Sequence, residues 1–186
     1  MIIITKYEKF MESKASDFDY GCVMIDLNVS NWKDILSEID PKDIYPGKTY
    51  GLQDNPHITF LYGLHPEVTF DQVQKCFDDV KGGDIKIEVE GVSIFENPEF
   101  DVVKLGVKEN PILSDINQNL SKLPNSNEFK EFIPHITVGY VNKGCGKKYI
   151  NPNFRHTING VKNVKYSKPN GDEHNIIIKE KFHFSI

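Results

Sequence analysis

The tetrapeptide Pro-His-Ile-Thr occurs twice in this chain, at residues 56–59 and again at residues 134–137. Each copy opens a run of apolar and aromatic residues, and its proline biases the preceding residue toward extended geometry, so both runs are predicted to be β-strands. Alternate side chains of a strand share a face, so His57 and Thr59 point one way and Ile58 the other. His135 and Thr137 obey the same rule. Two such strands facing each other would bring two imidazoles and two hydroxyls to one surface.

This set of four side chains suits acid–base chemistry on an anionic tetrahedral group, of which a phosphodiester is the commonest. Imidazole titrates near pH 6.5, so one histidine can act as a base while the other acts as an acid. Threonine donates a hydrogen bond without adding negative charge. Neither His-x-Thr unit has the acidic residue or the helical paired-histidine spacing typical of a zinc site. The sequence therefore predicts His57, His135, Thr59 and Thr137 as catalytic residues, with no metal and no cofactor.

These two strand-borne His-x-Thr units resemble the motifs of the two-histidine (2H) phosphoesterase superfamily, which includes RNA cyclic phosphodiesterases, 2′,5′-RNA ligase-like proteins and phage nucleases. The resemblance extends from about Tyr20 to Val141. It implies one bilobal α+β domain over residues 1–186, with two antiparallel sheets and flanking helices around a central cleft to which each lobe contributes one motif. It also implies metal-independent cleavage of a phosphodiester.

A narrower likeness is carried by residues 18–24, FDYGCVM, together with the run PHITFLYGLH that ends at His65. These residues resemble the phage anti-CBASS branch, whose members destroy cyclic di- and trinucleotide immune signals such as cyclic GMP-AMP. The likeness implies hydrolysis of 3′–5′ bonds in the host cytoplasm, with Tyr20 matching an active-site tyrosine. Two alternatives stay open: an RNA 2′,3′-cyclic phosphodiesterase or 2′,5′-RNA ligase-like enzyme, and a cyclic-nucleotide sponge without catalysis.

The charge of the chain favours a small substrate over a long one. Its formal net charge is −5, whereas a protein that grips a long RNA through many phosphates usually has a basic surface. A cyclic or short oligonucleotide needs only a local pocket of donors. Three cysteines without a CxxC pair indicate reduced thiols, and no apolar run approaches the length of a membrane span. We therefore expect a cytoplasmic protein that needs no long nucleic acid, membrane or obligate protein partner.

The remaining elements are predicted from periodicity and local capping signals. A strand is expected over residues 20–29, followed by a helix with Ser30 as its N-cap. Thr69 and Gln72 form a capping box for a second helix that ends at Gly82. The next strand shifts its apolar phase at Gly91, which predicts a β-bulge. A further strand is expected over residues 100–107, and the pair Asn110-Pro111 opens a third helix.

The C-terminal segment, residues 147–186, is predicted to form a long β-hairpin around the Asn170-Gly171 turn. Glu173 lies just after this turn and could contact a base or ribose. Phe95 lies at the end of the bulged strand and could stack on a base. With Tyr20, these residues complete the predicted substrate-binding set. Residues 1–17 have no clear period and are expected to be mobile.

Overall fold

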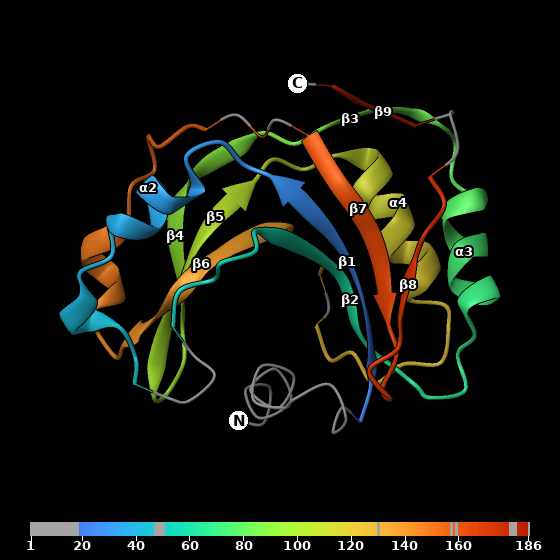
Figure 1. The fold of residues 1–186 in the computed structure, drawn as a ribbon, viewed down its shortest axis with the longest axis horizontal. Coiled ribbons are helices and arrows are strands. Elements are labelled where there is room, and N and C mark those ends of the chain that lie inside the picture. The colour runs from blue at the N-terminus through green and yellow to red at the C-terminus, as the bar shows by residue number, and fades with distance from the viewer. Residues whose placement is uncertain are drawn as a thin grey trace.

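The computed structural model of this chain describes residues 19–46, 51–129, 131–156, 158, 160–178 and 182–185; the expectation for residues 1–17 lies outside them. The fold has two antiparallel sheets, one of four strands and one of three, and a short parallel pair of strands. Figure 1 shows the two larger sheets side by side, with β2 and β6 adjacent at the centre. The α+β fold with two sheet-containing lobes is therefore confirmed. No helix in the described part is long and apolar enough to cross a membrane.

The first lobe is the four-stranded sheet, in the order β2 (His57–Leu64), β1 (Gly21–Asn28), β7 (Gly160–Ser167) and β8 (Glu173–Asn175). Helix α4 (Pro111–Leu120) packs against β2 and against helix α3 (Phe70–Asp78) (Figure 1). Alternate residues of β1 and β2, including Ile25 and Ile58, are buried in the main core. Their neighbours His57 and Thr59 therefore face the opposite side of the sheet.

The second lobe is the three-stranded sheet β4 (Val89–Glu96), β5 (Phe100–Val107) and β6 (His135–Asn142). Helix α2 (Trp32–Ser37) contacts β6, and two short 3₁₀ helices, η1 (Pro41–Asp43) and η2 (Gly146–Tyr149), lie in this lobe. The parallel pair consists of β3 (Gly83–Lys86) and β9 (Phe182–Ser185).

Local capping signals determine where α3 and α4 begin. Both hydrogen bonds of the Thr69–Gln72 capping box are present, and the Asn110 side chain accepts bonds from the backbone N–H groups of Ile112 and Leu113. Helix α3 ends at Asp78, however, before the predicted end at Gly82. The prediction of Ser30 as the cap of α2 is wrong. The N-cap is Asn31 in the left-handed conformation, which asparagine tolerates better than most residues, and its side chain makes no capping bond.

The bulge at Gly91 is confirmed by the register of β4 against β5. Pairing slips between Val89 and Val92, and Gly91 has a φ of 82°. A side chain there would also meet the backbone of Asn151 and Pro152 within 3.2 Å. Glycine is therefore required both by conformation and by close approach.

The predicted hairpin over residues 147–186 is only partly correct. The Asn170-Gly171 turn joins β7 to β8, but the return strand ends at Asn175. Beyond it, β9 leaves this sheet and pairs in parallel with β3. The start of this segment lies in η2, outside the hairpin. Alternating apolar residues predict a strand but do not specify which strand it pairs with.

Candidate functional site

The two predicted histidines occupy the first positions of β2 and β6, the strands that meet between the lobes. His57, Thr59, His135 and Thr137 are all half-buried, whereas the intervening Ile58 and Ile136 are fully buried. The His57 charge also contributes to the pKa of His135, so the two imidazoles lie close enough to interact. The structure thus brings the four predicted residues to one surface.

Both imidazoles are held by the same local hydrogen bond. Nδ1 of His57 lies 2.9 Å from the Asn55 carbonyl oxygen, and Nδ1 of His135 lies 2.8 Å from the Ile133 carbonyl oxygen. A carbonyl oxygen only accepts, so in each neutral ring Nδ1 carries the proton and Nε2 is left unprotonated. Each Nε2 is therefore available to accept a proton, or to donate one once the ring is charged.

The charges around the two histidines differ. Burial lowers the pKa of His57, while the Asn55 carbonyl and the Asp26 carboxylate oppose this shift and Lys165 adds to it. Asp26 lies on β1 directly opposite His57. Burial lowers the pKa of His135 to about 4, and the charge of Lys104 adds to the shift. A carboxylate therefore favours the charged form of His57, whereas the ammonium group of Lys104 disfavours the charged form of His135.

Each threonine lies two residues after its histidine on the same strand and therefore on the same face of the sheet. Thr59 pairs across the ladder with Met24, and Thr137 pairs with Lys104. The Thr59 hydroxyl lies within hydrogen-bond distance of the Cys22 thiol, and burial raises the pKa of that thiol, which keeps it neutral. Each threonine can therefore offer its hydroxyl to an anion beside a histidine without a carboxylate directly opposite it in the ladder.

A cavity of about 590 Å³ lies against this surface, a size typical of small-ligand pockets. Thr59, His135 and Thr137 line it, but His57 does not. The other lining residues come from β2, the second sheet, α4 and residues 127, 129 and 131–133. Three apolar side chains of its lining remain exposed: Phe95 by 37%, Phe129 by 50% and Ile133 by 55%. Exposed aromatic rings beside hydroxyls and an imidazole are suited to the flat face of a base.

Of the predicted substrate-binding residues, Phe95 lies in this cavity. Its ring centroid is 5.0 Å from that of His135, in an edge-to-face arrangement. Tyr20 is not among the lining residues, but it packs edge-on against Tyr62, which is, with centroids 6.2 Å apart. Its ring also lies 5.9 Å from that of His65. Tyr20 therefore supports the rim of the cavity.

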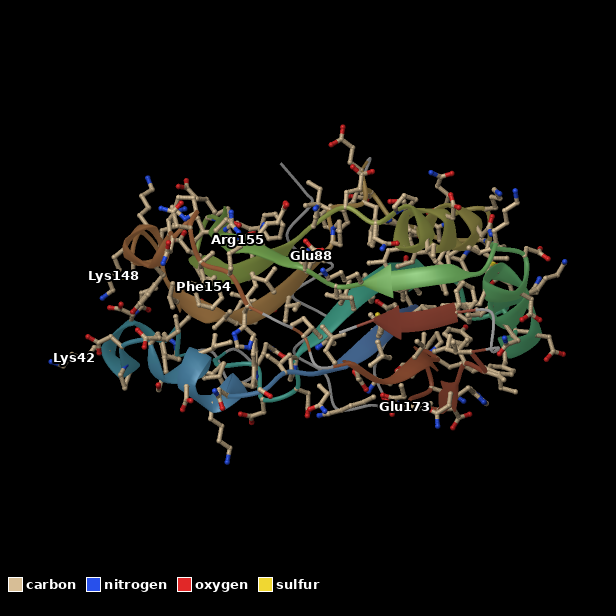
Figure 2. The ribbon with its side chains drawn as sticks, turned by 90° about the horizontal axis from the view of Figure 1, so that it is seen from above. Lys42, Glu88, Lys148, Phe154, Arg155 and Glu173 are labelled. Atoms are coloured by element: carbon tan, nitrogen blue, oxygen red, sulfur yellow. The ribbon has the colours of Figure 1, made fainter. Side chains whose placement is uncertain are left out.

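Glu173 lies outside the cavity lining, on β8 of the first lobe. It pairs with Lys165 at 3.3 Å, and Lys165 pairs in turn with Asp26 at 3.4 Å. Glu173 is thus connected to His57 through two charged side chains. Figure 2 shows Glu173 far from Lys42 and Lys148, which lie together at the opposite end of the molecule. Lys148 pairs there with the carboxylate of Asp43.

Sequence reasoning did not identify Lys104 or the wall formed by residues 127–133. The only signal for Lys104 was a single charge in the apolar run Val102–Leu105. Within the described ranges, no cluster of three or more histidine, cysteine or acidic side chains could hold a metal ion.

The chain matches a protein-family model and is similar in fold to solved structures. A family model described as the 2′-5′ RNA ligase superfamily matches residues 30–156. Comparison with the curated proteins finds no match. Usb1 of Kluyveromyces marxianus is similar in structure, with a TM-score of 0.53 and 10% identity over 87% of this chain and 98% of that one. The same protein with uridine monophosphate gives a TM-score of 0.50 and 10% identity, over 85% and 97%.

Proposed function

This chain belongs to the 2′-5′ RNA ligase superfamily of 2H phosphoesterases, and on that premise we propose that it is a metal-independent phosphodiesterase that cleaves 3′–5′ bonds of small cyclic oligonucleotides. The observation that carries the proposal is that the two imidazoles are held in the same way, each by a backbone carbonyl oxygen at Nδ1. A backbone carbonyl at Nδ1 leaves Nε2 as the unprotonated nitrogen of each ring, and each histidine lies two residues before a threonine on the same strand. This arrangement supplies an acid, a base and two neutral donors around one phosphate.

The unequal surroundings of the histidines support an assignment of roles. His135, whose charged form Lys104 disfavours, is the base, and His57, opposite Asp26, is the acid. His135 removes the proton from the ribose 2′-hydroxyl, whose oxygen attacks phosphorus. The bond from phosphorus to O5′ breaks as His57 donates its proton to that oxygen. The products are a 2′,3′-cyclic phosphate and a 5′-hydroxyl, with Thr59 and Thr137 donating to the non-bridging oxygens.

The cavity and the charge of the chain support a small substrate. A volume of about 590 Å³ with aromatic residues at its rim suits one or two nucleotides. The net charge of −5 disfavours a grip on a long phosphate backbone. In the narrower form of this proposal, carried by the residues 18–24 and by the first motif, the substrate is a CBASS signal such as cyclic GMP-AMP. The protein would then serve a phage in the host cytoplasm, with Phe95 stacking on a base.

A second candidate is an enzyme that processes RNA ends, which the family match and the likeness to Usb1 favour. One of the two Usb1 structures is of that protein with uridine monophosphate, which fits a nucleotide ligand for this fold. Such an enzyme would open 2′,3′-cyclic termini or trim RNA 3′ ends, and it would bind long RNA more tightly at low salt.

One experiment separates these candidates from a binding protein without catalysis. The protein is incubated with cyclic GMP-AMP, with other cyclic dinucleotides and with RNA bearing a 2′,3′-cyclic end, with and without a chelator, and the products are separated by chromatography. We expect linear products from the cyclic dinucleotides, unchanged by chelation. Turnover of RNA ends alone would favour the second candidate. Tight binding of all ligands without any product would identify a sponge.

A further inference from the structure

Lys165 and Lys104 face the cleft side of the sheets, but among the residues that the structure describes only Lys165 has carboxylate partners. Lys165, on β7, forms ion pairs with Asp26 at 3.4 Å and Glu173 at 3.3 Å. Burial lowers the pKa of Lys165, but these two carboxylates outweigh it and the net shift is upward. The positive charge of Lys165 is therefore already neutralised within the first lobe.

Lys104, on β5, has no such partner. Its side chain is only 7% exposed, and it forms no ion pair with any residue that the structure describes. Its Nζ donates to Ser93 Oγ at 3.0 Å and lies 4.3 Å from the centre of the Phe95 ring. Burial lowers the pKa of Lys104, and no carboxylate in the described ranges offsets that shift. A buried ammonium without a counter-ion is costly, and such groups are usually paired.

The register places Lys104 on the face of the sheet that carries the proposed site of reaction. Lys104 is directly opposite Thr137 in the β5–β6 ladder, and directly opposed residues share a face of the sheet. The Phe95 ring, which covers Nζ, is also in edge-to-face contact with His135. One of the three N–H groups of Nζ is bonded to Ser93 and the aromatic face takes a second, which leaves one for an anion.

We propose that Lys104 is a further substrate-binding residue, whose ammonium group binds a non-bridging oxygen of the phosphate held by Thr137 beside His135. This inference rests on the proposed function, because it names the charge that receives the substrate of that reaction. The phosphodiester brings one negative charge and is the counter-ion that Lys104 lacks. Binding is then driven by pairing of a cation that has already lost most of its water.

The same cation acts on His135. The groups that face this imidazole are Lys104 from β5, Phe95 from β4 and His57 from β2, and the acidic side chains Glu96 and Glu131 line the same cavity. Lys104 and His57 both disfavour a charged His135, so the ring stays neutral at neutral pH and can act as a base. Removal of the Lys104 charge should therefore change the pH dependence of the reaction as well as the affinity.

The test compares Lys104→Met and Lys104→Gln with Lys108→Met. Methionine removes the charge, and glutamine removes it while keeping a donor for Ser93. Lys108 follows the same strand but is exposed and pairs with Glu88, so it is a matched control. Affinity is measured by calorimetry with the 2′-deoxy analogue of cyclic GMP-AMP, which is expected to bind without being cut. Both Lys104 variants should bind it at least about tenfold more weakly, and Lys108→Met should bind it as the wild type does.

Two further measurements distinguish binding from a structural role. The acid limb of kcat/KM against pH should move upward by about one unit in both Lys104 variants, because His135 becomes easier to protonate. The melting temperature should stay the same or rise, since an unpaired buried charge has been removed. Wild-type affinity together with an unmoved acid limb in Lys104→Gln would overturn the inference while leaving the proposed function intact. If the wild type cuts no nucleotide, the proposed function fails, and equal binding of the analogue by wild type and Lys104→Gln would then overturn the inference separately.

Discussion

His57 and His135 make the same backbone hydrogen bond but have different charged neighbours. Asp26 stands opposite His57, whereas Lys104 acts on His135 from the neighbouring strand. A carboxylate favours the imidazolium form and an ammonium group disfavours it, so these charges support the proposed roles of His57 as acid and His135 as base. The hydrogen bonds fix the orientation of the rings, and the neighbouring charges fix their protonation.

If both histidines transfer protons, His57→Ala and His135→Ala should each lower turnover by roughly two to four orders of magnitude. Binding of the uncleaved 2′-deoxy analogue should change little, because neither imidazole is the main contact to the phosphate. The double variant should lose much less than the product of the two single losses, because the residues act as a unit. Steady-state rates and calorimetry measure these effects, and full activity of either single variant would rule out the two-histidine mechanism.

The assignment of acid and base predicts a selective rescue. A cyclic dinucleotide with sulfur in place of the 5′-bridging oxygen has a leaving group that needs no proton. His57→Ala should therefore cut this substrate at close to the wild-type rate, whereas His135→Ala should remain slow because the 2′-hydroxyl still needs a base. Rates on the oxygen and sulfur substrates are compared for both variants. Rescue of His135→Ala instead would reverse the two roles.

His135 should also make the fold sensitive to acid. Its pKa is about 4 in the folded protein, against 6.5 for a free imidazole. Between these values the unfolded chain binds more protons than the folded one, so stability rises with pH across this window. The shift corresponds to about 3 kcal/mol. His135→Gln should remove this part of the slope in urea unfolding between pH 4 and 7, and identical slopes in both proteins would contradict the shift.

At the scale of elements, the segment after α4 forms a wall of the cavity and is held by the end of β2. Leu64 and Asn125 form an isolated β-bridge, and Ser126 bonds to the Gly63 carbonyl oxygen through its backbone and to His65 through its hydroxyl. The wall therefore leads directly into the strand that carries His135. Its position depends on how closely the chain approaches Gly63.

Gly63→Ala should displace this wall. Gly63 has a φ of 108°, and an added Cβ would lie 3.0 Å from the Asn127 backbone nitrogen. Gly144→Ala is the matched control, because Gly144 has a φ of 86° but no atom within 4 Å of its Cβ position. Both changes should cost about 1–2 kcal/mol of stability from the backbone strain. Only Gly63→Ala should also raise KM severalfold, and equal KM values in the two variants would show that the wall does not contact substrate.

Elements whose signals are local could be predicted from the sequence. The capping residues Thr69 and Asn110 determine their helix starts through bonds to their own neighbours, and Gly91 forms the bulge that its phase shift predicts. Elements whose pairing depends on residues far away in the sequence could not be predicted. The segment Phe182–Ser185 has the alternation of a hairpin strand but pairs with β3 instead, where Phe182 is buried.

The residues of the candidate site also divide into those with a local signal in the sequence and those without one. The two His-x-Thr pairs could be predicted because their chemistry is contained in three residues and repeated. Lys104 could not be predicted, because its proposed role depends on residues from other strands. Ser93 and Phe95 contact it from β4, Thr137 lies opposite it on β6, and no carboxylate in the described part of the chain pairs with it. In the sequence it is one charge in an apolar strand.

At the scale of the whole molecule, the two lobes contribute unequally to one surface. The first lobe brings His57 with a lysine that is already paired, and the second brings His135 and Lys104, which forms no ion pair with any described residue; both lobes line the cavity. In the proposed mechanism an anion would therefore bind at the second lobe, with His57 of the first lobe as the acid. The nucleophile has to come from the substrate or from water, because the four motif side chains supply proton transfer and hydrogen bonds only.

The nucleophile can be identified with the sugar of the substrate. A route through the ribose requires a 2′-hydroxyl next to the 3′–5′ bond, so cyclic GMP-AMP should be cut whereas its 2′-deoxy and 2′-O-methyl analogues should bind and survive. The bases should matter less, because only the aromatic rim of the cavity contacts them. The rate on the ribo substrate should follow a bell against pH whose limbs belong to the coupled histidine pair.

The decisive comparison is between the ribo and 2′-deoxy substrates at matched concentration, with calorimetry to establish that both are bound. Cleavage of the ribo form alone would identify the 2′-hydroxyl as the nucleophile. Equal cleavage would mean that water attacks phosphorus directly, with His135 as its base. In that case the ribose-assisted route would be abandoned, but Lys104, Thr59 and Thr137 would retain their proposed contacts, because those depend on the phosphate and not on the sugar.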